Sequence, residues 1–252
     1  MTSNTTSKAG MKCLIHILEK DSSLIHAAAK AVALSFSNDP LITWLRPGAA
    51  LWGDLRPGSL QWQYRRLAWA RVEGIIVRAE VLCTPASSST EKNLQTNDCD
   101  EKCAGIGLIY PPQTVKKWGV GRIIEWLWLK FADIFCPRND EECSMERVEM
   151  LMNTHEAMLS KLKKRYSKDL WYIEICAVHP MAQGKGVGRA LMEWILAQAN
   201  GVPWFLECTK EENVAFYQKY GFETVEEVVL TEGKESVRLF CMVRHEQKGA
   251  DL

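Results

Sequence analysis

A glycine-rich loop between an apolar strand and an amphipathic helix constrains the fold of this chain more than any other feature. Residues 170–178 are mostly apolar, which predicts a strand, and residues 189–199 have the spacing of an amphipathic helix. The loop between them contains Gln183-Gly184-Lys185-Gly186-Val187-Gly188-Arg189. Its glycines let the backbone approach a ligand and point free amide hydrogens at it, and the helix N-terminus adds its positive dipole. With the charges of Lys185 and Arg189, the segment predicts a phosphate or pyrophosphate site.

Two other phosphate-loop classes compete for this segment and fit it less well. A Walker loop requires Ser or Thr after Gly-Lys, but Lys185 is followed by Gly186. A dinucleotide fingerprint needs a third glycine where Leu191 stands, and it would follow the first strand rather than a late one. A Rossmann oxidoreductase is therefore the weaker alternative, beside a glycine turn that binds nothing.

The loop resembles the acetyl-CoA signature of the GNAT N-acetyltransferase superfamily. Gln183, Gly186 and Gly188 have the spacing of that signature, and they follow a strand that ends Ala-Val-His-Pro at residues 177–180. A second block at residues 213–222, NVAFYQKYGF, resembles the helix and turn that lie downstream in that superfamily. Because two motifs occur in the right order, the resemblance is more specific than either motif alone.

The resemblance is strongest in the C-terminal half of the chain. Over residues 169–244 the sequence looks most like the puromycin N-acetyltransferase-like branch, with the strand WFLE at residues 204–207 before the second block. In the N-terminal half the similarity reduces to residues 33–36 and Asp39-Pro40. The resemblance therefore supports the identity of the cofactor more strongly than the identity of the acceptor amine.

The resemblance implies a fold and an activity. The fold is α/β (α+β), the GNAT fold, in which helices flank a central mixed, mostly antiparallel, splayed β-sheet. The implied activity is an acetyl-CoA-dependent N-acetyltransferase that transfers the acetyl group directly to the amine of a small molecule, such as a xenobiotic, antibiotic or secondary metabolite. The alternatives are a protein or peptide N-acetyltransferase and a non-catalytic acyl-CoA-binding module. The expected partners are acetyl-CoA and the amine, for a monomer or a homodimer.

The resemblance also implies which residues hold acetyl-CoA. In that superfamily free backbone groups of the strand before the loop hold the pantetheine arm, and an amide near Cys176 polarises the thioester carbonyl. Asn213 would bind the cofactor arm, with an ordinary helix N-cap as its alternative. No metal is expected. The expected cofactor-binding residues are Cys176, Ala177, Val178, Gln183, Gly184, Lys185, Gly186, Val187, Gly188, Arg189, Asn213 and Phe216.

The acceptor side is predicted from the alternation of side chains along the strand at residues 170–178. Tyr172, Glu174, Cys176 and Val178 should share one face and line the acceptor site. Glu174 is a carboxylate in an apolar strand, so it is the predicted base for the amine, directly or through water, with Tyr172 able to share the role. An ion pair between Glu174 and a lysine or arginine is the competing interpretation.

Tyr217 occupies the position of the superfamily's tyrosine that protonates the leaving coenzyme A thiolate. A covalent acyl-enzyme on Cys176, activated by His179, is disfavoured, because a thiol in an apolar strand should have a raised pKa. His155 lies on an apolar helical stripe, which favours a role in the core. Four tryptophans fall in the region expected to cover the acceptor cleft and hint at an apolar or aromatic amine, although such residues more often belong to the core: Trp44, Trp52, Trp62 and Trp69.

Composition bounds the remaining classes. A chain of 252 residues with 47% apolar and 25% charged residues predicts one large globular domain. Because Lys+Arg and Asp+Glu both number 31 and no dense basic run is available to follow a phosphate backbone, nucleic acid is not an expected partner. The apolar stretch at residues 120–135, a predicted helix, contains four charged residues, so no membrane span is expected. Nine irregularly spaced cysteines predict reduced thiols and a cytoplasmic protein.

The domain organisation follows from the same scan. Residues 1–11 are expected to form a flexible tail, and residues 12–246 a single domain. Residues 84–102 lack apolar periodicity and predict a disordered insertion between two strands. Cys99 and Cys103 within or beside this insertion lack a second ligand pair, so a zinc site is not favoured.

Overall fold

The computed structural model describes residues 3–6, 11–18, 22–47, 57–83, 101–112, 143–166, 169–199 and 201–245. Several predicted features lie outside these ranges: the helix at residues 120–135, Trp52, Cys99 and nearly all of the insertion at residues 84–102. Residues 3–6, in the segment predicted as a tail, form a short edge strand.

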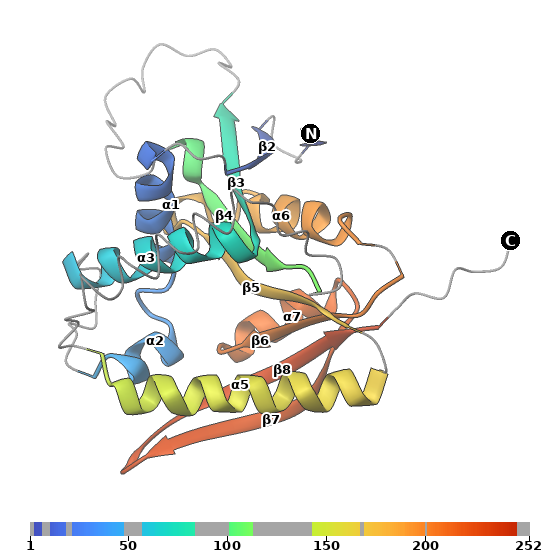
Figure 1. Cartoon of the computed structure of the whole chain (residues 1–252). Helices are drawn as coiled ribbons and strands as arrows, with labels where there is room; N and C mark the ends of the chain where they lie inside the picture. Colours follow the sequence, from blue (N-terminus) through green and yellow to red (C-terminus); the bar gives the residue numbers. More distant parts are fainter. Residues whose placement is uncertain are drawn as a thin grey trace, which may run out of the picture.

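Eight strands form one sheet in the order β1-β2-β3-β4-β5-β6-β8-β7 (Figure 1). Every neighbouring pair is antiparallel except β5 and β6, which are parallel, so the predicted mixed, mostly antiparallel sheet is confirmed. The strands are β1 (Ser3–Thr6), β2 (Met11–Ile17), β3 (Ile75–Cys83), β4 (Gly105–Tyr110), β5 (Trp171–Val178), β6 (Trp204–Cys208), β7 (Phe222–Glu232) and β8 (Glu235–Arg244).

The sheet splays between its two parallel strands. β5 and β6 pair only at their beginnings, from Trp171 with Trp204 to Ile173 with Leu206. Beyond Ile173 the described strands diverge, and the edge of β5 that would face β6 keeps its backbone donors and acceptors for other partners. The predicted splay is therefore present, and it lies directly before the glycine loop.

Helices cover both faces of the sheet (Figure 1). The helical elements are α1 (Ser22–Ser35), α2 (Pro40–Leu45), α3 (Pro57–Glu73), α5 (Met145–Tyr166), α6 (Val187–Leu196) and α7 (Glu211–Gln218), with short 3-10 turns at Glu101–Cys103 and Pro180–Ala182. One core cluster packs α6 on its face of the sheet, a second packs α1 and α3 on the opposite face, and a third packs α5 on β6 and β8. None of the helices in the described ranges is long and apolar enough to cross a membrane.

A one-residue shift in strand pairing at Glu174 changes which way β5 presents its side chains. Leu108 pairs with Ile175, but Ile109 pairs with Ile173, so Glu174 is the extra residue of a β-bulge. A shift of one residue turns the following side chains to the other face of the sheet. Ile173 accordingly packs in the cluster of α6, whereas Ile175 packs in the cluster of α1 and α3.

The bulge corrects the prediction that four alternate side chains of β5 share one face. Tyr172 packs with the cluster of α5, and Glu174 pairs with a side chain of α3. Cys176 and Val178 instead pack against the cluster of α6 on the opposite face. The prediction failed because strict alternation assumes an unbroken ladder, and nothing in the strand's own sequence marks the bulge.

Candidate active site

The glycine loop, the end of β5 and α7 enclose a cavity of about 510 Å³, here called the loop cavity. Every residue predicted to bind the cofactor lines it except Lys185, which is exposed. Tyr217, predicted as the proton donor, also lines it. The two sequence blocks that are about 25 residues apart therefore come together around one cavity, as the motif order predicts.

Two glycines give the loop its shape. Gly184 and Gly186 have φ of 73° and 84°, a left-handed backbone that glycine adopts without strain. Gly186 is the N-cap of α6, and the first intrahelical bond runs from the Ala190 N–H to the Gly186 carbonyl at 3.0 Å. The N–H groups of Val187, Gly188 and Arg189 precede that bond and have no acceptor within the helix. The positive end of α6 thus lies at the cavity, where it suits an anion.

Side chains of the loop contribute less than its backbone. Gln183 Nε2 donates to the Val178 carbonyl at 3.2 Å, which ties the loop to the end of β5. Arg189 Nε lies 2.6 Å from Glu193 Oε1 in an exposed ion pair within α6. The predicted cationic contribution of Arg189 is therefore shared with a carboxylate, and its energetic weight is small.

Tyr217 and Asn213 face the loop cavity from α7. Burial, with smaller contributions from Cys176, Cys208 and Asp39, raises the pKa of the Tyr217 phenol well above its usual range, so the phenol keeps its proton at neutral pH. Asn213 is not a helix cap, because the N-cap of α7 is Lys210. Both residues are thus available to a ligand in the cavity.

The covalent alternative on Cys176 is unsupported by its surroundings. Burial raises the pKa of the Cys176 thiol to about 12, which leaves almost no thiolate near neutral pH. His179 is buried beyond the strand, where its Nδ1 accepts a hydrogen bond from the Met181 N–H at 3.2 Å. Direct transfer remains the simpler chemistry.

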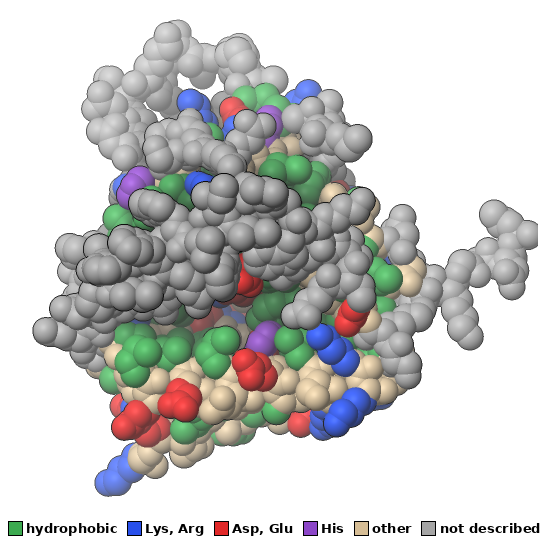
Figure 2. Space-filling view, viewed as in Figure 1, with side chains coloured by type: hydrophobic (Ala, Val, Ile, Leu, Met, Phe, Trp, Pro, Cys, Tyr) green, Lys and Arg blue, Asp and Glu red, His purple; other side chains and the backbone are tan. Residues whose placement is uncertain are grey.

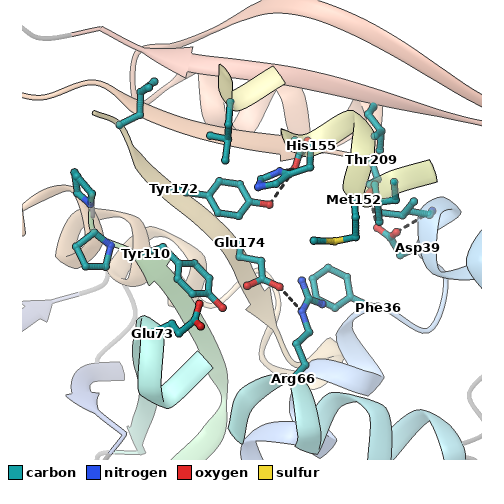
Figure 3. A pocket seen from close by; sticks show the side chains of 18 of the residues that line it. Phe36, Asp39, Arg66, Glu73, Tyr110, Met152, His155, Tyr172, Glu174 and Thr209 are labelled. Atoms are coloured by element: carbon teal, nitrogen blue, oxygen red, sulfur yellow. Dashed lines mark hydrogen bonds and ion pairs between the residues drawn. The ribbon is translucent and has the colours of Figure 1, made fainter. Parts of the chain in front are cut away.

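A second cavity of about 480 Å³ lies on the face covered by α1, α3 and α5, and is here called the α5 cavity (Figure 3). In Figure 2, hydrophobic side chains on this face lie beside acidic and histidine side chains along the edge of α5. Phe36 and Asp39 line both cavities, so the two adjoin at the turn between α1 and α2. Asp39 is buried there, caps α2 and accepts a hydrogen bond from the Thr209 hydroxyl at 2.5 Å.

Glu174, the predicted base, lines the α5 cavity but already has partners (Figure 3). Its Oε1 lies 2.5 Å from Arg66 Nε of α3. Tyr110 of β4 also hydrogen-bonds to this carboxylate, and burial together with the charge of Glu174 raises the pKa of the Tyr110 phenol. The ion pair that was the competing interpretation of Glu174 is therefore present.

Tyr172 contacts two cavity residues that the sequence did not mark as functional. Its hydroxyl donates to Glu207 Oε2 at 3.0 Å, and the same oxygen lies 2.8 Å from His155 Nδ1. The rings of His155 and Tyr172 lie 4.7 Å apart (Figure 3). The core position predicted for His155 is thus corrected to a cavity wall. Glu207 carried one usable signal: like Glu174, it is a carboxylate inside an apolar strand.

The pKa of His155 reflects opposing effects. Burial lowers it, but the hydrogen bond and charge of Glu207, with the charges of Glu174 and Glu156, outweigh burial and raise it above its ordinary value. Glu207 Oε1 is buried and has no hydrogen-bond partner within the described residues. This wall of the cavity therefore combines a histidine that is hydrogen-bonded to a carboxylate with a second oxygen of that carboxylate that accepts no hydrogen bond from the described residues.

None of the tryptophans that the structure describes lines the α5 cavity, so the hint of a tryptophan cover is not supported for them. Trp44 is buried against Arg147, and neither Trp62 nor Trp69 is among the residues that line the α5 cavity. Its aromatic lining comes from Phe36, Tyr110 and Tyr172 instead. Tryptophan content alone could not separate core positions from cavity positions.

Comparison with known proteins finds similarity in the part of the chain that forms most of the loop cavity. Residues 151–224 match the family model of the acetyltransferase (GNAT) domain. An uncharacterized N-acetyltransferase of Schizosaccharomyces pombe is 31% identical over 98 residues. That alignment covers 38% of this chain and only 39% of the relative.

Solved structures share the fold at low sequence identity. A histone acetyltransferase and related acetyltransferase of Corynebacterium glutamicum superposes with a TM-score of 0.53 at 15% identity, covering 94% of this chain and 98% of that one. Arylalkylamine N-acetyltransferase 2 of Aedes aegypti gives 0.53 at 14% identity, and polyamine N-acetyltransferase of Drosophila melanogaster gives 0.51 at 11%. Each of these two covers 92% of this chain and is itself covered to 99%. The predicted fold class is confirmed.

Proposed function

We propose that this chain is an acetyl-CoA-dependent N-acetyltransferase that transfers the acetyl group directly to the amine of a small molecule. One observation carries the proposal: β5 lines both cavities, which adjoin at Phe36 and Asp39. Tyr172 and Glu174 belong to the α5 cavity, and Cys176 to Val178 belong to the loop cavity. A thioester held in the loop cavity and an amine held in the α5 cavity would therefore meet along β5.

The loop cavity has the features that the acetyl-CoA donor requires. The edge of β5 beyond Ile173 is free to hydrogen-bond the pantetheine amides, and the first-turn N–H groups of α6 suit the pyrophosphate. We assign to the protonated phenol of Tyr217, which lines this cavity, the donation of a proton to the departing thiolate. Acetyl-CoA supplies the activated acetyl group, and the chain supplies its position.

The α5 cavity supports a small cationic amine as the acceptor. Its volume lies within the range of about 300–1,000 Å³ typical of small-molecule sites. Among the described residues, its walls combine the aromatic rings named above with more carboxylates than basic side chains. The basic side chains are Arg66, Lys163 and His155, and the five carboxylates are Asp39, Glu73, Asp169, Glu174 and Glu207. A surplus of carboxylates favours a positively charged ligand. The names of the arylalkylamine and polyamine acetyltransferases that share the fold agree with this class.

Two finer assignments also remain proposals. The likeness to puromycin N-acetyltransferase-like members rests on residues 169–244. A cytoplasmic location rests on cysteine usage: the cysteines that the structure describes in full, from Cys13 to Cys241, are free thiols.

The proposal is tested by mixing the protein with acetyl-CoA and a panel of amines and following release of the coenzyme A thiol. The panel contains puromycin, arylalkylamines, polyamines and a peptide with a free N-terminus. We expect saturable thiol release with at least one small amine, and a mass increase of one acetyl group on that amine. Acetyl-CoA binding without release for any amine would indicate a binding module, and release with the peptide alone would indicate a peptide acetyltransferase. Binding of NADH but not of acetyl-CoA would refute the assignment.

A further inference from the structure

We propose that His155, positioned by Glu207, is the residue that takes the proton from the acceptor amine, in place of Glu174. This inference rests on the proposed function. It assigns a catalytic role to a side chain whose position in the sequence predicted a core residue, and a positioning role to a carboxylate that the sequence did not mark.

Three elements that are distant in sequence assemble this arrangement. α5 supplies His155, β6 supplies Glu207 and β5 supplies Tyr172, and all three line the α5 cavity. Because Nδ1 of His155 lies 2.8 Å from a carboxylate oxygen, the neutral imidazole donates its proton there, and Nε2 is left with the free lone pair. The hydroxyl of Tyr172 holds the same oxygen at 3.0 Å and so fixes the position of the carboxylate.

The second oxygen of Glu207 strengthens the assignment. Oε1 is buried and has no hydrogen-bond partner within the described residues, although buried carboxylate oxygens are normally satisfied. The side chain of Glu207 is only 11% exposed, so bulk solvent does not compensate it. Because no donor of the described residues engages Oε1, the negative charge of Glu207 is left to polarise the His155 imidazole.

Glu174 is less free than His155 to act on a proton. Its carboxylate is engaged by Arg66 and by Tyr110, on two different elements. Its position as the extra residue of the bulge directs it toward α3, where it neutralises a guanidinium. We assign Glu174 a structural role: it links Arg66 of α3 and Tyr110 of β4 in the wall of the cavity opposite α5.

The charged and titratable groups around His155 set its pH dependence. Glu207 of β6, Glu174 and Tyr172 of β5 and Glu156 of α5 face or surround it, and Lys163 and Asp169 line the same cavity. Burial lowers the pKa of His155, but the hydrogen bond and charge of Glu207, with the charges of Glu174 and Glu156, outweigh it and raise this pKa above its usual value of 6.5. The neutral form that can accept a proton therefore grows as pH rises through that raised pKa.

The transfer balances as follows. The ammonium form of the bound amine first releases one proton to solvent. The nitrogen lone pair then forms a bond to the thioester carbonyl carbon, and His155 Nε2 takes the second proton that the nitrogen loses. The carbon–sulfur bond breaks with its electron pair going to sulfur, and the Tyr217 phenol gives sulfur a proton. The proton on the imidazolium then returns to the phenolate through solvent, so a neutral amine and a thioester yield an amide and a thiol.

The experiment compares four proteins with acetyl-CoA and the best amine of the panel: wild type, His155→Asn, Glu207→Gln and His26→Asn. Asparagine can keep a hydrogen bond to Glu207 but offers no Nε2. His26→Asn is the matched control, because His26 is exposed on α1, stacked on Tyr64 and outside both cavities. We expect kcat/KM to fall about 100-fold in His155→Asn and to remain unchanged in His26→Asn.

The positioning role of Glu207 is read from pH profiles. In Glu207→Gln the acidic limb of kcat/KM should move to lower pH, and the ring signal of His155 in an NMR titration should move with it, because the group that raises its pKa is gone. A purely structural role would lower the rate without moving the limb. If His155→Asn fails to fold, this shift still decides the question.

The outcomes separate the two proposals. If wild type turns over an amine but His155→Asn keeps its full kcat/KM, or if Glu207→Gln leaves the limb in place, the assignment of the base is wrong and the proposed function stands. If wild type binds acetyl-CoA and acetylates nothing, the proposed function fails and the assignment fails with it.

Discussion

The loop cavity and the α5 cavity share β5, yet they are built in different ways. The loop cavity uses the backbone of one continuous segment, residues 176–189, together with α7 and the end of α1. The α5 cavity uses single side chains of the turn before α2 and of elements from α2 to β8. A site made of backbone leaves a local signature of glycines in the sequence, whereas a site made of scattered side chains leaves none. The variants below test that contrast.

The largest effect is expected in the loop cavity. Tyr217→Phe should lower kcat about 100-fold while the affinity for acetyl-CoA changes little, because only the proton of the phenol is removed. Steady-state rates and calorimetric titration with acetyl-CoA measure the two quantities. Unchanged kcat would show that Tyr217 only packs against Phe216 and Phe222.

A backbone-built site should be sensitive to side chains that alter its backbone. Gly186→Val places a β-branched residue at φ 84°, so binding of acetyl-CoA should weaken about tenfold through backbone strain. Isothermal titration measures it, with a thermal melt to confirm that the variant folds. Equal affinity for wild type and variant would mean that the loop does not form the cofactor site.

In the α5 cavity, we expect only a small loss of activity when Glu174 is replaced, although the sequence predicted Glu174 as the base. Glu174→Gln keeps the shape of the wall and removes one charge beside Arg66, so kcat/KM should fall far less than the about 100-fold expected for a catalytic base. The acidic limb of the pH profile should keep its shape. A loss as large as that of His155→Asn would restore Glu174 as the base.

The smallest effect is expected at a residue that the loop motif highlights. Lys185 is exposed and is the one predicted cofactor residue that does not line the loop cavity. Lys185→Ala should change the affinity for acetyl-CoA less than about threefold, the scale of an exposed ion pair. A loss of tenfold or more at low salt would show that Lys185 reaches the phosphates.

The sequence predicted β5, the glycine loop, α6, β6 and α7 in the right order, because apolar periodicity and glycine breaks reveal such elements locally, but it missed β1, whose residues were expected to form a tail. The residues predicted to bind the cofactor all line the loop cavity except Lys185. It did not predict the bulge at Glu174, since a bulge depends on the pairing with β4, which the sequence of β5 does not contain.

The proposed role of His155 could not be predicted from the sequence for a related reason. A histidine on an apolar helical stripe has the same pattern in a core as beside a cavity, and only the packing of α5 across β6 brings His155 to Glu207. Long-range pairs of this kind, 52 residues apart in the chain, are invisible to local patterns.

If the two cavities hold the two halves of one reaction, a crystal structure with a bisubstrate analogue should show both cavities occupied by one molecule. The analogue joins coenzyme A through its sulfur to the best amine by an acetyl bridge. We expect the pyrophosphate at the N-terminus of α6, the sulfur near Tyr217 and the amine arm in the α5 cavity beside His155 and Glu207. An amine arm outside the α5 cavity, or coenzyme A bound away from residues 183–189, would contradict this expectation.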